Sequence, residues 1–211
     1  MEILFGSLGI AGGILCLIGD VLLDYKGKGN KTLGKYKFIE SKWDNMANWR
    51  FKASIPFASA GVPLYFLGFT ALAMQISSKP LALCFWIACI IGSVGGVFMH
   101  GLLCVFPVLY KTISENRAFE ETEGILNTVI NLIKLPFFFH HFFLVIASSV
   151  LAGYAVIGGY LSLPIWTVIF MPLCMMILGL VLKTVTKRDF PGTTSFGIAM
   201  VGLMAILNYT L

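Results

Sequence analysis

Charged side chains are scarce in this sequence. Of its 211 residues, 12% are charged and 58% are hydrophobic, and several long stretches carry no charge at all. Uncharged apolar runs of about twenty residues match the thickness of a bilayer core. The longest polar gap, residues 24–52, is too short to hold a separate soluble domain. The sequence therefore predicts an integral membrane protein whose function depends on its helix walls and polar loops.

Several common functional signatures are also missing. The chain has no nucleotide-binding loop, nucleophile elbow, kinase signature or HExxH motif, and we expect no nucleic-acid partner. Its five cysteines form no CxxC pair, which argues against a disulfide framework or a cysteine-rich metal site. The first apolar run lacks a preceding basic segment and a small-x-small cleavage site, so we expect a retained span and not a signal peptide.

Six apolar runs alternate with polar gaps. The expected spans are residues 3–23, 53–76, 81–109, 135–158, 163–183 and 192–211. The predicted fold class is therefore all-α, a single polytopic domain (residues 1–211) that forms a six-transmembrane-helix bundle. The third run is too long for a straight span, so it should tilt, kink at Pro107 or project beyond the membrane.

The basic residues are confined almost entirely to one set of gaps. Fourteen of the fifteen Lys and Arg residues lie in the gaps after the first, third and fifth runs, when Lys183 at the very end of the fifth run is counted with the gap that follows, and Lys79 is the exception. By the positive-inside rule, these three gaps face the cytoplasm and both termini face outward. An odd number of spans would break this separation. We therefore expect a multi-pass protein of the plasma membrane.

Ionisable residues inside a bilayer are costly, and each one is a candidate for function. The predicted spans contain four such residues, all in the cytoplasmic half: Asp20, His100, His140 and His141. At about 1.5 Å per helical residue, their depths in the membrane differ by roughly 10 Å. The four side chains can meet only if the third helix tilts or extends below the membrane. We predict that these four residues form the catalytic or binding centre.

Histidine and aspartate offer metal binding or proton transfer. A zinc site would use His100, His140 and Asp20 as ligands and keep one position open. Because adjacent helical residues diverge by about 100°, His140 and His141 should not both face one metal. A haem iron held axially by His100 and one of the pair is a less favoured cofactor. The simpler alternative is that all four are interfacial or internally hydrogen-bonded residues with no chemical role.

Two polar segments are expected to lie on the cytoplasmic membrane surface. Residues Lys37–Arg50 should form an amphipathic helix with Ile39, Trp43 and Met46 on its apolar face. This helix is either a passive anchor or a lid over the mouth of the bundle. With a lid, the substrate-binding candidates are Trp43, Asp44, Arg50 and Tyr110.

The second polar segment, Ser114–Lys134, should form another surface-lying stretch that turns into the fourth span at Pro136. Prolines also interrupt the second and fifth spans, at Pro63 and Pro172. Prolines at equivalent places in two three-helix halves are typical of transporters with inverted repeats. The GxxxG spacings at Gly9/Gly13 and Gly92/Gly96 indicate close helix packing within the bundle.

Four short motifs resemble an uncharacterised family of bacterial six-helix membrane proteins. They are GDVLLDY at the end of the first span, PLYFLGF in the second, MHG in the third and a histidine that opens the fourth. This resemblance covers most of the chain and implies the six-helix fold but no activity. At the level of site chemistry, Asp20 and the three histidines are similar to the inner-leaflet residues of the alkaline ceramidases and adiponectin receptors, which have seven spans.

These observations leave several functions open. The leading hypothesis is a small membrane enzyme or binding protein for a lipid or another hydrophobic molecule, and as an enzyme it would be a metal-dependent or acid/base hydrolase. The rivals are a small-solute transporter with proline-broken helices and a non-catalytic membrane scaffold or regulator. Membrane lipids are the expected partners, and the sequence does not determine the oligomeric state.

Overall fold

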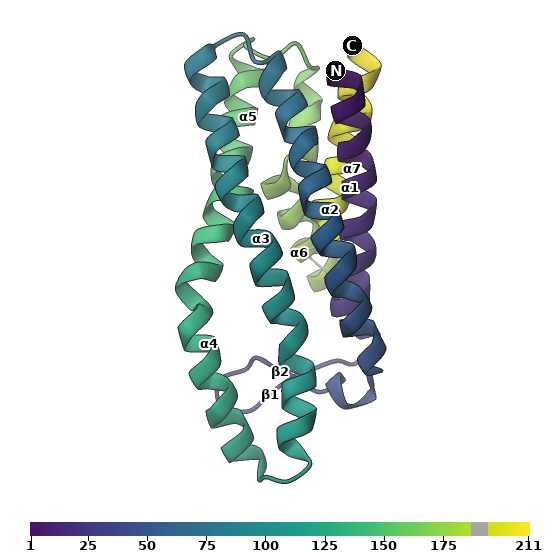
Figure 1. The fold of residues 1–211 in the computed structure, drawn as a ribbon, viewed down its shortest axis with the longest axis vertical. Helices are drawn as coiled ribbons and strands as arrows, with labels where there is room; N and C mark the ends of the chain where they lie inside the picture. Colours follow the sequence, from purple (N-terminus) through teal and green to yellow (C-terminus); the bar gives the residue numbers. More distant parts are fainter. Residues whose placement is uncertain (187–193) are drawn as a thin grey trace.

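The computed structural model describes residues 1–186 and 194–211, and it is all-helical apart from one small hairpin (Figure 1). The α-helices are α1 (Glu2–Asp24), α2 (Asn48–Gln75), α3 (Lys79–Ser114), α4 (Phe119–His141), α5 (Ser148–Ile157), α6 (Pro172–Thr186) and α7 (Thr194–Thr210). A π-helical turn, η2 (Phe142–Ala147), joins α4 to α5. The predicted all-α class is confirmed.

Within the described residues, four helices are long and apolar enough to cross a membrane. These are α1, α2, α3 and the continuous helix of residues Phe119–Ile157, whereas α6 and α7 are shorter apolar helices. The predicted fifth span is discontinuous: the 3-10 helix η3 (Ile165–Phe170) comes first, and α6 begins only after the extended residue Met171. The predicted basic residues Lys187 and Arg188, and residues 192–193 at the start of the predicted sixth span, lie outside the described residues.

Pro63 and Pro172, the prolines of the predicted second and fifth spans, have different effects on their helices. Pro172 begins α6 directly after the break at Met171. Pro63, in contrast, lies inside α2, which continues for 28 residues without interruption. The inverted-repeat signature of two equivalent broken helices is therefore not formed.

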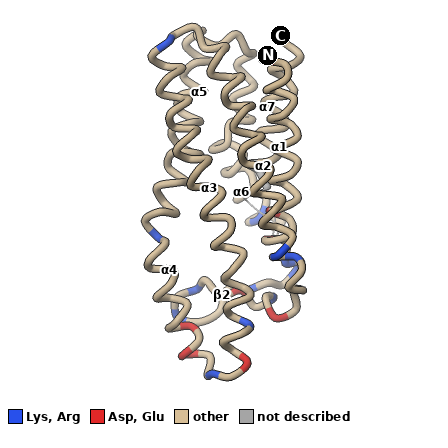
Figure 2. The backbone as a smooth tube through the Cα atoms, viewed as in Figure 1, with Lys and Arg blue, Asp and Glu red and all other residues tan. Residues whose placement is uncertain are grey.

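The two ends of the bundle differ in charge. The N- and C-termini lie at the same end, and the Lys and Arg residues of the described chain gather toward the opposite end (Figures 1 and 2). Lys79 is the exception, because it is the first residue of α3. Helices α1, α2 and α7 pack closely through small residues, because a Cβ atom added to Gly9 would lie 2.7 Å from the Gly68 Cα atom of α2. Gly13 likewise faces Gly197 of α7, so the Gly9/Gly13 pair mediates packing inside the bundle.

Helices α3 and α4 extend as a pair beyond the rest of the bundle, away from the termini (Figure 1). The 36 residues of α3 make a helix about 54 Å long, which exceeds a hydrocarbon core of about 30 Å. Pro107 lies within α3 and does not end it. The predicted surface-lying segment Ser114–Lys134 is wrong, because α4 begins at Phe119 and runs through Pro136 without a turn.

The predicted amphipathic helix at Lys37–Arg50 is also wrong. Strand β2 (Ile39–Glu40) pairs antiparallel with β1 (Thr32–Leu33), a 3-10 turn η1 (Trp43–Asn45) follows, and α2 starts at Asn48. We call residues 25–47 the cap. The apolar side chains that suggested a helical face, Ile39, Trp43 and Met46, are buried in a cluster with residues of α3 and α4. Their spacing reflects packing against the α3–α4 extension and not a face turned toward lipid.

Polar contacts fix the cap to that extension. The Tyr36 N–H donates to Glu123 Oε1 of α4 over 2.9 Å. Glu123 is only 6% exposed and lies under Gly34, whose φ of 73° and tight contact with the carboxylate leave no room for a side chain. On α3, Lys111 donates to the Met46 carbonyl and to Asn48 Oδ1. The cap is therefore an ordered part of the protein.

Candidate functional site

One cavity of about 90 Å³ brings together residues from α1, α3 and α4. Asp20, His100, His140 and His141 all line it. The other lining residues are Cys16, Ala58, Tyr65, Gly96, Met99, Leu103 and Leu144. The structure thus places the four sequence-predicted residues around a common space, which we call the polar cavity. Their catalytic role stays a prediction.

The depth difference between these residues is removed by the length of α3. Asp20 lies about one turn before the end of α1, whereas α3 continues for fourteen residues beyond His100, to Ser114. Because α3 projects past the end of α1, His100 reaches the level of Asp20. The His100 Nδ1 atom lies 3.4 Å from Asp20 Oδ1, and both side chains are almost fully buried.

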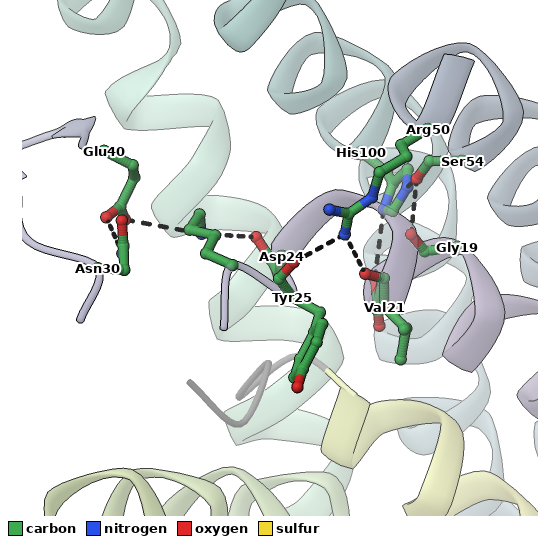
Figure 3. A network of polar contacts seen from close by, with 11 residues as sticks. Gly19, Val21, Asp24, Tyr25, Asn30, Glu40, Arg50, Ser54 and His100 are labelled. Carbon is green, nitrogen blue, oxygen red and sulfur yellow. Dashed lines mark hydrogen bonds and ion pairs between the residues drawn. The ribbon is translucent and has the colours of Figure 1, made fainter. Parts of the chain in front are cut away.

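The other ring nitrogen of His100 contacts Ser54 of α2 (Figure 3). Ser54 Oγ lies 2.7 Å from His100 Nε2 and 2.7 Å from the Gly19 carbonyl oxygen of α1. A carbonyl oxygen only accepts, so the single hydroxyl proton of Ser54 goes to Gly19. His100 Nε2 must then donate to Ser54 Oγ, and Nδ1 and Asp20 share the next proton between them. Ser54 Oγ therefore accepts a hydrogen bond from His100 and donates one to Gly19, so this hydroxyl is not placed as a nucleophile.

His140 and His141 are held through the other ring nitrogen, since each donates from Nδ1 whereas His100 donates from Nε2. His140 Nδ1 donates to the Gly92 carbonyl of α3 over 2.6 Å, and His141 Nδ1 donates to the Phe137 carbonyl over 2.9 Å. In a neutral ring this leaves Nε2 as the lone-pair acceptor. The two ring centroids lie 4.9 Å apart. The polar cavity therefore combines two imidazole acceptors with an aspartate–histidine pair that holds a proton.

The backbone around His140 has two unusual features. The ring approaches α3 closely because Gly95 has no side chain: a Cβ atom there would lie 2.9 Å from His140 Cβ. Directly after His141, the helix continues as the π-helical turn η2, in which the hydrogen-bond pattern is one residue wider than in an α-helix. Such turns are frequent at functional sites.

The predicted zinc site is not formed by this geometry. Among the described residues, no group of three or more His, Cys, Asp or Glu side chains is arranged to hold a metal ion. The reason is visible in the hydrogen bonds: both ring nitrogens of His100 already face protein oxygens, and His140 uses Nδ1 to bind α3. The same pairing leaves His100 no nitrogen for the less favoured axial haem ligation.

A larger apolar pocket adjoins the polar cavity. It has a volume of about 360 Å³, and Leu103 lines both spaces. Phe137 also connects them, because it lines the apolar pocket and its ring centroid lies 4.0 Å from that of His141. The remaining lining residues come from α1, the cap, α3 and α4, and are Leu23, Asp24, Lys26, Phe38, Glu40, Trp43, Phe106, Pro107, Ile130, Ile133, Lys134 and Phe138.

Only one of the four predicted substrate-binding residues lines this pocket. Trp43 does so from the cap. Arg50 instead donates to the Val21 and Tyr25 carbonyl oxygens, over 3.0 and 2.7 Å, and so caps the last turn of α1 (Figure 3). Asp44 and Tyr110 face each other at 3.5 Å, outside the pocket. Burial, followed by the negative charge of Asp44, raises the pKa of the Tyr110 hydroxyl.

Two buried polar residues with long-range contacts, Ser54 and Glu123, escaped sequence reasoning. Ser54 was not distinguishable from the other serines of the spans, because its partner His100 comes from a helix distant in the sequence. Glu123 belongs to a group of glutamates that looks like a solvated face, yet it is buried under the cap. A sequence signal for either contact is absent, since both depend on how α3 and α4 are placed.

The fold and the site define a class: an all-helical protein whose long apolar helices indicate a membrane protein, with an aspartate–histidine cavity inside the bundle. Within that class, the chain belongs to a family of unknown function (DUF6796), whose model matches residues 2–211. The predicted resemblance to an uncharacterised family is thereby confirmed. No curated protein and no solved structure matches the chain.

Proposed function

We propose that this protein crosses the plasma membrane six times and binds a lipid or another hydrophobic molecule in the half of the bundle nearest the cap. In this topology, η3 and α6 together form the fifth span and α7 forms the sixth. The common end of the two termini and the gathering of Lys and Arg at the other end support an even number of spans with the cap in the cytoplasm.

The observation that carries the binding function is the adjacency of the two cavities. The apolar pocket of about 360 Å³ is within the usual range of ligand sites, roughly 300–1,000 Å³. Such sites combine apolar walls with a few polar groups that fix orientation. Here the shared wall at Leu103 and the contact between the Phe137 and His141 rings bring those polar groups to one end of the apolar pocket.

The polar cavity also supplies acid/base chemistry to a bound molecule. The Asp20–His100 pair holds a proton that it can donate, and Nε2 of His140 or His141 can accept one. Because Ser54 directs its own proton to Gly19, any hydrolytic attack in this site would come from water. A volume of about 90 Å³ holds roughly three waters.

Co-purification tests the binding function. The protein is purified in a mild detergent, and retained lipids are extracted and measured by mass spectrometry. We expect the wild-type protein to retain a stoichiometric lipid and Leu103→Trp, which fills the shared wall, to lose it. Val105→Trp, on the exposed side of the same helix, is the matched control and should retain the lipid. Absence of lipid from the wild type, or equal retention by both variants, would contradict the proposal.

Cysteine labelling in intact cells tests the topology. In a background without the five native cysteines, Lys79→Cys and Lys28→Cys each provide one exposed thiol, on opposite ends of the bundle. A membrane-impermeant maleimide should label Lys79→Cys in intact cells and label Lys28→Cys only after the cells are opened. The reverse pattern would show that the orientation is inverted.

A further inference from the structure

A second apolar opening lies between α3 and α4, with a volume of about 440 Å³. Its lining residues are Ile90, Ile91, Val94, Gly95, Pro136, Phe139 and His140. The side chains at its rim face outward, since Val94 is 69% exposed and Phe139 is 54% exposed. We call this opening the lateral groove. In the proposed topology it faces the acyl chains of the bilayer.

Among the residues that the structure describes, His140 alone lines both the lateral groove and the polar cavity. Its ring is a wall between an apolar surface open to lipid and a buried set of polar groups. Every other residue of the groove is apolar or glycine, so a molecule that lies in it meets its first polar partner at His140. The position of this ring is fixed by its bond to the Gly92 carbonyl.

The polar cavity limits the chemistry of the group that could enter. His140 and His141 both use Nδ1–H for carbonyl oxygens, so a neutral ring offers a lone pair at Nε2. Charging both rings at a centroid separation of 4.9 Å inside an apolar bundle would be unfavourable. A phosphate or carboxylate would meet these lone pairs and the Asp20 carboxyl, whereas a hydroxyl group can donate to them. The cavity volume also restricts the group to a few heavy atoms.

We propose that the ligand is a neutral lipid with a terminal hydroxyl group, which enters sideways from the bilayer through the lateral groove and donates a hydrogen bond to His140. This inference rests on the proposed lipid-binding function and adds the class of lipid and its route. During entry the hydrocarbon part lies in the lateral groove between α3 and α4, and the hydroxyl reaches the polar cavity.

Photolabelling tests both the class and the route. The wild-type protein is reconstituted into phosphatidylcholine vesicles with a long-chain primary alcohol that carries a photoreactive group in its chain. Parallel samples contain the corresponding methyl ether and the corresponding fatty acid. Labelled peptides are then identified by mass spectrometry. We expect the alcohol to label residues 90–95 and 136–140 about fivefold more than either analogue, which is the effect of one hydrogen bond.

Variants on the exposed face of α3 separate the groove from general membrane labelling. Val94→Trp fills the lateral groove and should reduce labelling by the alcohol several-fold. Phe98→Trp, one turn further along the same exposed face and outside the groove, should leave the labelling unchanged. Both positions are exposed, so neither substitution disturbs the buried core. Equal labelling by the three probes, or no effect of Val94→Trp, would overturn the inference.

The location of the label distinguishes this inference from the function on which it rests. Labelling confined to the apolar pocket, for example at Ile130 and Phe138, would overturn the lateral route while the lipid-binding function stands. Absence of both specific labelling and co-purifying lipid would remove the two together. Stronger labelling by the fatty acid would replace the hydroxyl class with an anionic one.

Discussion

Replacing Ser54 with alanine should destabilise the bundle by about 1–2 kcal/mol, although the change removes a single oxygen atom. Ser54 is fully buried, and its hydroxyl links α1, α2 and α3 through Gly19 and His100. The Gly19 carbonyl lies within α1 and keeps its helical partner, so it loses little. His100 Nε2–H, in contrast, loses its acceptor inside the protein.

Two scales bracket the cost of that orphaned donor. An unsatisfied buried donor costs about 1–3 kcal/mol in soluble proteins. Side-chain hydrogen bonds between membrane helices average about 0.6 kcal/mol and reach about 1.7. Ser54 has no exposure to solvent or lipid, so its site resembles a protein interior more than a bilayer. We therefore expect a value near the overlap of the two ranges. For a chain of this length it corresponds to a decrease of roughly 2–8 °C in Tm.

The assay is equilibrium unfolding of the detergent-solubilised protein, followed by circular dichroism. Ser59→Ala, on the exposed side of the same helix, is the matched control and should change stability by less than about 0.5 kcal/mol. Equal effects of the two substitutions would refute the reasoning. Nitrogen NMR of His100 provides an independent check, because Nε2 should carry a proton in the wild type. An unprotonated Nε2 would mean that Ser54 donates to His100, as a nucleophile does.

Three further substitutions test other parts of the structure. Gly95→Ala forces the ring behind it to move, so it should abolish lipid retention and destabilise the fold by about 1–3 kcal/mol, whereas Gly101→Ala, which meets nothing within 4 Å, should not. Glu123→Ala should release the cap and speed its cleavage by trypsin several-fold, and exposed Glu120→Ala should leave the rate unchanged. The pKa of Tyr110 is raised from its usual 10.0, so its stabilising contribution is complete below pH 10 and lost as pH rises through the raised pKa. The Tm of the wild-type protein should therefore fall in that range, and Tyr110→Phe should reduce that fall.

The sequence predicted those features of the fold that the thickness and polarity of a bilayer restrict. Apolar run lengths located the long helices, and the excess length of the third run anticipated the projection of α3. The side of the membrane assigned to each polar residue gathered Asp20 and the three histidines, which the structure places around one cavity. These results follow from run length and from the side of the membrane, both of which can be counted along the sequence, and the length of α3 then removes the remaining difference in depth.

Rotation about the helix axis and long-range packing were not predictable in the same way. The sequence could not show that His100 would use both ring nitrogens on protein partners, an arrangement in which no three candidate ligands among the described residues are placed for a metal ion. The expected amphipathic helix failed because Trp43 and its apolar neighbours had a better partner than lipid, the α3–α4 extension. That partner became available only because α4 passes Pro136 without a turn.

The π-helical turn η2 sets the rotation of one half of the fourth helix about its axis relative to the other half. It lies between the half that carries His140 and His141 and the half formed by α5, and its wider hydrogen-bond spacing accommodates one extra residue. Each residue added to or removed from a helix rotates everything beyond it by about 100°. The π-turn takes up such a shift, so deleting one residue between 142 and 147 would restore a regular helix and leave the two halves in nearly the same relative rotation. The histidines and the contacts of α5 would then keep their partners, so this stretch should tolerate the loss of one residue far better than the insertion of another, which would turn one half relative to the other.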